Sequence, residues 1–323
     1  MSFGEGELTL RLRVEGGRVA RAQVHSTRPP KLGRLLEGKP VAEVATLVPA
    51  LFSVCRVGQG VCALAALGQP QPSAGPALVL EALEHHAWQL DVEWPRALGL
   101  PPQAEALRQT LGLLRAGPGP VLVEHLRAKF DTALDRGSVG AQFLRRAAEL
   151  DRGVEWPEPR VGHPTLSECE AGLSDSADFA ARPGPLEVGP LARVKDLPEM
   201  RDLAQRQGWG LETRARARVL DAQHALEQLA AQDFPAVQVI DRGAGVRAAM
   251  VQVARGPLVH RVVREGDRTV GWRSVAPTEW TFHPDGAVQA LVGTMALAVQ
   301  ERARLYVSLL DPCVLCAVEV VNA

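Results

Sequence analysis

Hydrophobic and polar residues alternate near the start of the chain, in "ELTLRLRVEGGRVARAQVH". Leucine and valine occupy every second position from Leu8 to Val14, and Gly16 and Gly17 separate this run from a second one. Alternation on both sides of a glycine pair predicts a β-hairpin, which we place within residues 1–30.

Between residues 41 and 235 the apolar residues recur at three- and four-residue spacing, which predicts a mainly helical region. Connections rich in proline and glycine, such as "GQPQPSAGP" and "ARPGPLEVGPLAR", separate its segments. We expect helices over residues 41–67, with an interruption near 56–60, and over 78–92, 102–115, 143–151 and 209–232.

Residues 236–323 change character again. "GPLVHRVVREGDRTVGWRSVAP" predicts a second hairpin with its turn at "EGD", and "DGAVQALVGTMALAVQERARLYVSLL" predicts a final helix that leads to Asp311 and a C-terminal CxxC. The sequence therefore predicts an α-rich α+β fold. Because no linker is long enough to form a clear boundary, we expect one domain over residues 1–323.

Charge and composition narrow the choice of partners and compartment. The 36 Lys and Arg residues balance 37 Asp and Glu, so no positive field exists to attract nucleic acid or an anionic membrane. We find no apolar stretch long enough to span a membrane and no signal-peptide pattern at the N-terminus. With five cysteines and no export signal, we expect a cytoplasmic protein with reduced thiols.

The candidate chemistry centres on "DPCVLC". Cys313 and Cys316 are three residues apart, so both sulfurs can point at one atom, and thiolates suit zinc, iron, nickel or copper(I). The same spacing also fits a redox pair, half of a zinc site or two buried cysteines. A structural zinc needs two more ligands, and the sequence contains no second CxxC and no HxxxH.

The remaining thiols lie at other spacings. We expect Cys55, Gln59 and Cys62 on one helical face, with the two thiols about 10 Å apart along a regular helix, too far for one metal. Cys62 and Cys169 are therefore interpreted as structural residues.

Several other residues have simple structural interpretations. His260 lies in an apolar strand and is expected to be a packed histidine, whereas His85 and His86 are expected on a helix surface. By itself Arg255 is a surface-turn arginine, and "RDLAQRQGWGLETRARARVLD" is a solvated helix face. Four tryptophans are expected in the core: Trp88, Trp94, Trp272 and Trp280.

The end of the chain resembles the C-terminal metal motif of the large subunit of nickel-iron hydrogenases, Asp-Pro-Cys-x-x-Cys-x-x-His. Further stretches resemble motifs of that family in the same chain order: "EGEL" with "STRPPKLGRLLEGKP", then "EVGPLAR", "ARGPLVHRV" and "APTEW". The resemblance extends over nearly the whole chain. It implies the large-subunit-like fold, a helical core with N-terminal and late β-hairpins.

Three positions depart from the hydrogenase pattern. The family's N-terminal motif is Arg-x-Cys-Gly-x-Cys-x-x-x-His, and "ALFSVCRVGQ" has Phe52 for the first cysteine and Gln59 for the histidine. Glu319 replaces the histidine of the C-terminal motif, and only four residues follow it, so we expect no extension that is removed on maturation. Because a phenyl ring cannot bind a metal, the four-thiolate nickel-iron site cannot form. We therefore expect a protein that is not an enzyme.

This shortened pattern, with "LFSVC" and "HHAWQLDVEWP", resembles the HupK/HoxV type of hydrogenase accessory proteins. The resemblance implies a maturation scaffold that transiently holds iron with carbonyl and cyanide ligands, and nickel is not expected. The implied partners are a small HypC-type carrier chaperone, other maturation proteins and the immature large subunit.

The resemblance also assigns residues to the site. Cys313, Cys316 and Cys55 match metal ligands, and Arg255 matches the arginine beside the diatomic ligands. The remaining matches are Pro277, Thr278 and Glu5. Two alternatives stay open at this point, a metal-free interaction module that engages maturation partners and a divergent hydrogenase large subunit.

Overall fold

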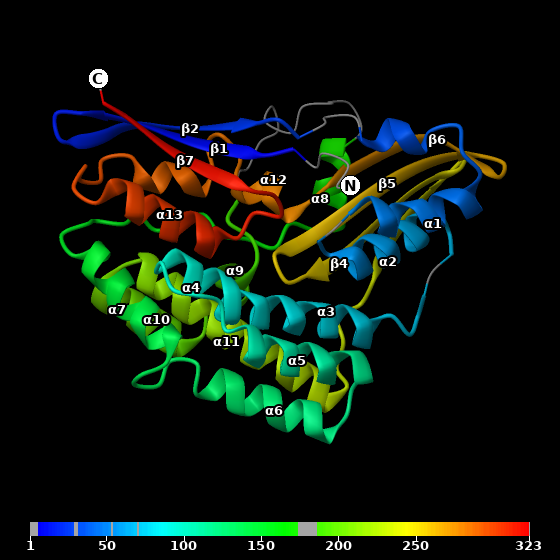
Figure 1. Cartoon of the computed structure of the whole chain (residues 1–323). Coiled ribbons are helices and arrows are strands. Elements are labelled where there is room, and N and C mark those ends of the chain that lie inside the picture. Colours follow the sequence, from blue (N-terminus) through cyan, green and yellow to red (C-terminus); the bar gives the residue numbers. More distant parts are fainter. Residues whose placement is uncertain (1–5, 29–31, 53, 70, 174–185, 323) are drawn as a thin grey trace.

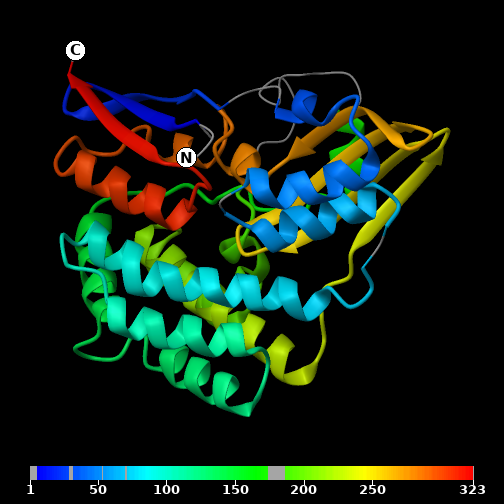
Figure 2. The same cartoon turned by 45° about the vertical axis from the view of Figure 1, so that its right-hand side comes forward.

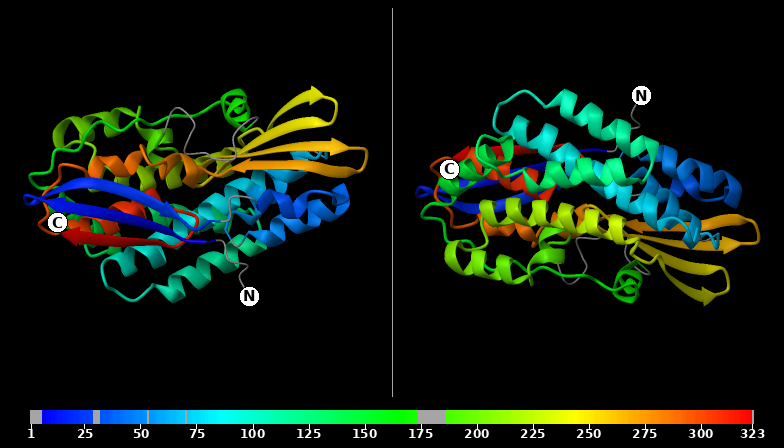
Figure 3. Two further views of the ribbon diagram at one scale, coloured as in Figure 1. Left: turned by 90° about the horizontal axis from the view of Figure 1, so that it is seen from above. Right: turned by 90° about the horizontal axis from the view of Figure 1, so that it is seen from below.

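The molecule consists of two small β-sheets that lie end to end above a body of helices (Figures 1 and 3). The computed structural model describes residues 6–28, 32–52, 54–69, 71–173 and 186–322. Glu5, one of the residues that the resemblance assigns, lies outside these described ranges. The element order confirms the predicted α-rich α+β class.

The first sheet joins the two ends of the described chain. β1 (Leu8–Glu15) and β2 (Arg18–Ser26) form the predicted antiparallel hairpin, and alternate residues of β1 are buried. β7 (Cys316–Asn322) pairs in parallel with β1, which gives the strand order β2-β1-β7. The sequence analysis missed this C-terminal strand, which fixes the end of the cysteine motif beside β1.

The second sheet is an antiparallel meander of four strands. β5 (Gly256–Glu265) and β6 (Arg268–Val275) form the predicted second hairpin, whereas β3 (Gln238–Gly243) and β4 (Val246–Val253) were not predicted. Hydrophobic residues of both faces are buried. α2 (Arg56–Ala66) packs on one face, and α8 (Leu166–Leu173) packs on the sheet through a separate core cluster.

α11 (Leu211–Ala231) runs through the centre of the helical body and packs against α3, α6, α7, α9 and α13 (Figure 2). The predicted helices correspond to α1 with α2, α3, α5, α7 and α11. α6 was missed, although its buried residues recur at four-residue spacing. The helices whose bounds have not yet been given are η1 (Leu32–Leu36), α1 (Val41–Leu51), α3 (Gly75–Trp88), α4 (Trp94–Ala97), α5 (Ala104–Ala116), α6 (Pro120–Asp131), α7 (Val139–Asp151), α9 (Pro190–Val194), α10 (Pro198–Gln207), α12 (Pro277–Thr281), η4 (Ala287–Leu291) and α13 (Val299–Leu310).

The helix predicted over residues 78–92 is longer than expected and contains a π-helical turn. α3 continues through η2 (Gln89–Glu93) into α4. A π-helical turn changes the direction of the side chains that follow it, and such turns are frequent at functional sites. Trp88 at the end of α3 is 39% exposed, so its predicted core position was wrong, whereas Trp94, Trp272 and Trp280 are buried as predicted.

One predicted helix is interrupted at a different place from the one expected, and another is interrupted where no break was expected. The first ends at Leu51 and α2 restarts at Arg56, because Cys55 adopts a left-handed backbone with φ 56°. The predicted final helix is split into η4 and α13. Between them, Gly293 has φ +84° and Thr294 accepts a backbone hydrogen bond from Val19, so contact with the first hairpin replaces the helical bonds.

Candidate functional site

The centre of the site is Asp311, the residue that directly follows α13. Its backbone is left-handed, with φ 57°, and its side chain is only 4% exposed. The carboxylate accepts from His85 Nε2 at 2.5 Å and from Gln89 Nε2 at 2.8 Å. Arg218 Nη1 and Arg255 Nη2 each lie 3.2 Å from a carboxylate oxygen. Two hydrogen bonds and two ion pairs from different parts of the chain therefore fix one carboxylate.

These donors keep Asp311 ionised. Burial alone opposes ionisation, but the charges of Arg255 and Arg218 and the hydrogen bond from His85 outweigh it and hold the pKa of Asp311 well below its usual range. His85 is neutral in this arrangement, because burial and the charge of Arg255 lower its pKa to about 4. In the neutral ring Nε2 donates to Asp311 and Nδ1 accepts from Arg255.

Arg255 connects Asp311 to the thiols. It lies in the turn between β4 and β5 and is 8% exposed, so its interpretation as a surface-turn arginine was wrong. Its Nε donates to the Asp311 carbonyl at 3.0 Å, and its Nη1 donates to Cys55 Sγ at 3.3 Å. Burial disfavours the charge, but Asp311 and the thiols Cys55 and Cys313 raise the pKa of Arg255, so it stays charged.

Cys55 and Cys313 share this arginine. Burial raises the pKa of the Cys55 thiol to about 12, and the charge of Arg255 opposes part of that shift. Cys313 lies within electrostatic range of both groups. The Cys313 amide donates to Thr278 Oγ1 at 3.0 Å, and Pro277 and Thr278 are both buried in the first turn of α12. The structure therefore brings Cys55, Cys313, Arg255, Pro277 and Thr278 together.

Cys316 has different surroundings. It is the first residue of β7, lies opposite Leu8 and packs at the edge of the hydrophobic core beneath the first sheet. Burial raises its pKa to about 11, and the amide of Leu10 opposes the shift. Among the described residues, no group of three or more His, Cys, Asp or Glu side chains could hold a metal ion together. The folded chain thus presents two thiols at Arg255 and keeps the third apart.

The residues that the resemblance places at hydrogenase ligand positions have other contacts. Gln59 Oε1 lies 2.8 Å from Nε2 of His260, which is a packed histidine as predicted and lies edge-on to Trp272. Phe52 packs against the core between α2 and the second sheet. Glu319 is half-exposed on β7 and pairs with Arg11 at 2.9 Å.

The two other thiols are buried, in agreement with their structural interpretation. Cys62 donates to the Ala249 carbonyl at 3.2 Å, and Cys169 is buried in α8. Cys55 does not share a helical face with Cys62, because Cys55 precedes the first residue of α2. That part of the sequence prediction was wrong, since the left-handed backbone of Cys55 ends the helical geometry there.

A second layer of charge surrounds Asp311. Arg193, from "EVGPLAR", binds Asp221 through Nε at 2.6 Å and donates to the Ala254 carbonyl, directly before Arg255, at 2.5 Å. His86 Nε2 also lies 3.2 Å from Asp221. Both histidines were expected on a helix surface. Instead His86 is fully enclosed, because α3 packs against α11.

The arginine-rich stretch supplies this layer, so its interpretation as a solvated face was wrong for its buried residues. Arg214, Arg218 and Asp221 recur at four- and three-residue spacing on one side of α11 and are all buried. That spacing is visible in the sequence, but it is the same for a solvated and for a buried face. Three arginines at positions 193, 218 and 255 form ion pairs with two aspartates at 221 and 311, so among the groups in direct contact arginines outnumber carboxylates by one.

Glu81 is a further residue that the sequence analysis missed. Its carboxylate accepts from the amides of Val57 and Gly58 at 2.6 and 2.9 Å and so caps the start of α2 beside Cys55. Burial raises the pKa of Glu81, and the two amides oppose that shift. The contact fixes the turn that presents Cys55 to Arg255.

The chain is similar to hydrogenase expression/formation proteins over nearly its whole length. The chain is 32% identical to the hydrogenase expression/formation protein HupK of Rhodobacter capsulatus over 316 residues, which cover 95% of this chain and 96% of that protein. It is 30% identical to HupK of Bradyrhizobium diazoefficiens, with 97% and 96% covered. It is 26% identical to the hydrogenase expression/formation protein HoxV of Cupriavidus necator, with 97% and 96% covered. No protein-family model matches the chain.

Among solved structures the chain is similar to nickel-iron-selenium hydrogenases. The reduced, active enzyme of Desulfomicrobium baculatum gives a TM-score of 0.61 at 15% identity and covers 94% of this chain and 95% of the other. An enzyme variant of Desulfovibrio vulgaris Hildenborough gives 0.59 at 16% identity, with 93% and 94% covered. At such identities the likeness establishes the fold, which is that of a hydrogenase large subunit. Together with the near full-length relatives, these findings show that the chain belongs to the HupK/HoxV family of hydrogenase expression/formation proteins.

Proposed function

We propose that this chain is a non-catalytic scaffold in the maturation of nickel-iron hydrogenase, which transiently holds iron with carbonyl and cyanide ligands before its insertion into the large subunit. Family membership supports a role in hydrogenase maturation. The observation that carries the finer proposal is that Cys55 and Cys313 both lie within range of the buried guanidinium of Arg255, with the Thr278 hydroxyl on the Cys313 amide.

The donor set fits such a cargo. Thiolates are soft ligands that suit iron, and cyanide nitrogen accepts hydrogen bonds from guanidinium N–H and hydroxyl groups. Arg255 and Thr278 supply both kinds of donor beside the thiols. In the folded chain only two thiols meet at Arg255, and Phe52 stands at the position of another hydrogenase ligand. A low ligand count favours release of the iron over permanent retention.

The charge of the site favours an anionic cargo. Burying an unpaired charge is costly, and the two buried aspartates neutralise only two of the three arginines. Thiolates formed on binding, together with cyanide ligands, would neutralise the remaining charge. We propose that the iron centre arrives from a HypC-type carrier chaperone and other maturation proteins, and that the immature large subunit receives it in the cytoplasm.

An infrared spectrum of protein purified without oxygen from a maturation-competent host tests the proposal, with iron and nickel quantified on the same sample. We expect carbonyl and cyanide bands with iron and without nickel, and loss of both bands and iron in Cys313→Ser and Cys55→Ser. Cys62→Ser is the matched control, because its hydroxyl can still donate to the Ala249 carbonyl and the thiol lies outside the site.

Two outcomes would contradict the proposal. Normal hydrogenase maturation with Cys313→Ser and Cys55→Ser, and no metal in the purified protein, would favour a metal-free interaction module. Bound nickel with hydrogen turnover would favour a divergent hydrogenase.

A further inference from the structure

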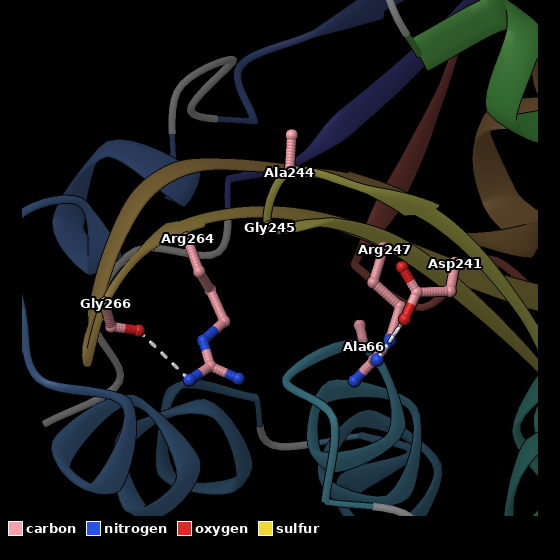
Figure 4. A pocket seen from close by; sticks show the side chains of 7 residues that line it. All are labelled: Ala66, Asp241, Ala244, Gly245, Arg247, Arg264 and Gly266. Carbon is pink, nitrogen blue, oxygen red and sulfur yellow. Dashed lines mark hydrogen bonds and ion pairs between the residues drawn. The ribbon is translucent and has the colours of Figure 1, made fainter.

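A cavity at the end of the second sheet faces two arginines (Figure 4). Its volume is about 390 Å³, within the range of small-molecule sites. Apart from Arg247, Arg264 and Asp241, its lining consists of small residues: Ala66, Ala244, Gly245 and Gly266. We call this space the arginine cavity.

Strand geometry explains why the arginines point the same way. Side chains alternate between the two faces of a strand. The core cluster that includes α2 contains Ala249 and Val251 of β4 and Val262 of β5. Arg247 continues the row of Ala249 and Val251, and Arg264 continues that of Val262. Both arginines lie beyond the apolar residues of their rows, at the end of the sheet where α2 has ended. The β5–β6 pairing is irregular between Val263 and Arg264, as in a β-bulge, which re-aims side chains.

Gly68 brings the two guanidinium groups together. This glycine follows α2 with φ +80°, a conformation that side chains rarely adopt. A Cβ atom at this position would overlap Arg247 Nη1 and would lie 3.4 Å from Arg264 Nη1. The absence of a side chain thus lets two like charges converge on one place, which costs free energy unless an anion joins them.

The cavity has fewer carboxylates than guanidinium groups. Arg247 forms an ion pair with Asp241, with Nε donating at 3.1 Å and Nη2 also donating. Arg264 donates to the carbonyls of Leu67 and Gly266 at 2.6 and 3.1 Å. In the part of the chain that the structure describes, its buried Nε has no hydrogen-bond partner. Asp241 is the one acidic side chain in the lining, so a positive charge is left over.

We propose that the arginine cavity binds the phosphate group of a small molecule. Free donors of two guanidinium groups approach from different strands, which suits a tetrahedral oxyanion with several acceptor oxygens, and Arg–phosphate bonds are strong because both partners are charged. The small lining residues leave room for the group that carries the phosphate. The carboxylate of Asp241 already forms an ion pair with Arg247.

This cavity is separate from the candidate metal site. Cys55 precedes the first residue of α2 and Gly68 follows its end, and the 11 residues of α2 span about 16 Å. The proposal therefore does not rest on the proposed function, and variants in the cavity leave Cys55, Cys313 and Arg255 in place.

Isothermal titration of the full chain with inorganic phosphate and with glycerol phosphate, at constant ionic strength, tests the proposal. We expect saturable binding that weakens by about tenfold or more in Arg247→Gln and in Arg264→Gln, the size of a lost charge-assisted hydrogen bond. Arg268→Gln is the matched control, because Arg268 lies on the adjacent strand and donates to the Gly38 carbonyl. Circular dichroism checks that each variant is folded.

Either ligand supports the proposal, and the tighter of the two identifies a phosphate ester or free phosphate as the physiological form. Acetate is the competing probe. Saturable binding of acetate without phosphate, equal phosphate binding in all three variants, or no saturable phosphate binding by the folded chain would each overturn it.

Discussion

Two buried clusters of charge lie one turn apart on α11, and they differ in how completely they are neutralised. Arg214 forms a bidentate pair with Glu187 at 2.9 and 2.7 Å and stacks over the Tyr306 ring, 4.8 Å from its centre. One turn later Arg218 reaches Asp311, which already binds Arg255. The first cluster has equal numbers of opposite charges, and the second has more arginine than carboxylate.

The difference separates a structural ion pair from a site. In the Glu187 pair the two charges satisfy each other, so nothing remains for a ligand. Around Asp311 the extra donors of Arg255 point to Cys55 and His85. A protein retains a costly, unbalanced cluster where the imbalance has a use. The following predictions test this comparison, from the largest expected effect to the smallest.

Asp311→Asn should have the largest effect on stability. The substitution keeps the shape of the side chain but leaves Arg218 and Arg255 buried without a counter-charge, so we expect the free energy of unfolding to fall by about 3–5 kcal/mol. Denaturant unfolding measures this. Glu319→Gln removes a carboxylate from an exposed pair and should cost about 1 kcal/mol or less. Equal losses in the two variants would contradict the assignment of Asp311 as the centre.

Acid should weaken the site through His85. The pKa of His85 is lowered to about 4 in the folded chain, whereas unfolded histidine titrates near 6.5. Between these values the unfolded chain binds more protons, so stability falls as pH decreases, by up to about 3 kcal/mol from His85. Below about pH 4 protonation of Asp311 in the unfolded chain adds a further loss.

Thermal unfolding between pH 7 and 4 measures this dependence. In His85→Gln the amide can still donate to Asp311 and does not titrate, so the slope between pH 6.5 and 4 should be shallower. An unchanged slope would show that other histidines, such as His86 and His260, account for it.

Arg255→Lys should affect metal binding more than stability. A lysine keeps the charge but cannot donate to the Asp311 carbonyl, Cys55 and His85 at once. We expect iron retention to fall by about tenfold, as for other residues that orient metal ligands. Iron content per protein after dialysis measures the effect, with Arg268→Lys as the control. Full retention would mean that Arg255 contributes charge alone.

Replacing both members of the balanced pair should have the smallest effect. Glu187→Leu alone leaves Arg214 uncompensated and should destabilise strongly, whereas Glu187→Leu combined with Arg214→Met should restore most of the stability, to within about 2 kcal/mol. The double variant should load iron like the original chain. Loss of iron from a stable double variant would show that the two clusters act together.

The sequence predicted the parts of the fold that depend on local periodicity. The alternation from Leu8 to Val14 gave the first hairpin, and the spacing of apolar residues gave α3, α5, α7 and α11. It did not reveal β3, β4 or β7. Strand β3 is largely exposed and lacks a regular apolar pattern, whereas β7 alternates but pairs with β1 at the opposite end of the described chain.

The residues of the candidate site were assigned by the motif resemblance, which does not give their arrangement. The motif resemblance identified Cys55, Cys313, Arg255 and Thr278, and the structure places these four together. His85 and Arg218 were assigned to surfaces. A charged residue on a helix has the same sequence spacing whether its face meets water or a second helix. The packing of α3 against α11, which buries these two residues, is therefore not visible in the sequence.

The sequence by itself determined which thiols the chain carries, that Phe52 stands where the resemblance places a hydrogenase ligand, and that helices and strands form where the local apolar spacing favours them. These are properties of composition and of neighbouring residues. Only the tertiary structure decided that Cys55 and Cys313 share Arg255 while Cys316 lies on β7, and that Asp311 collects two hydrogen bonds and two arginine charges. Such contacts join segments that are far apart in the chain, and their free energy is realised only when the whole core has excluded water.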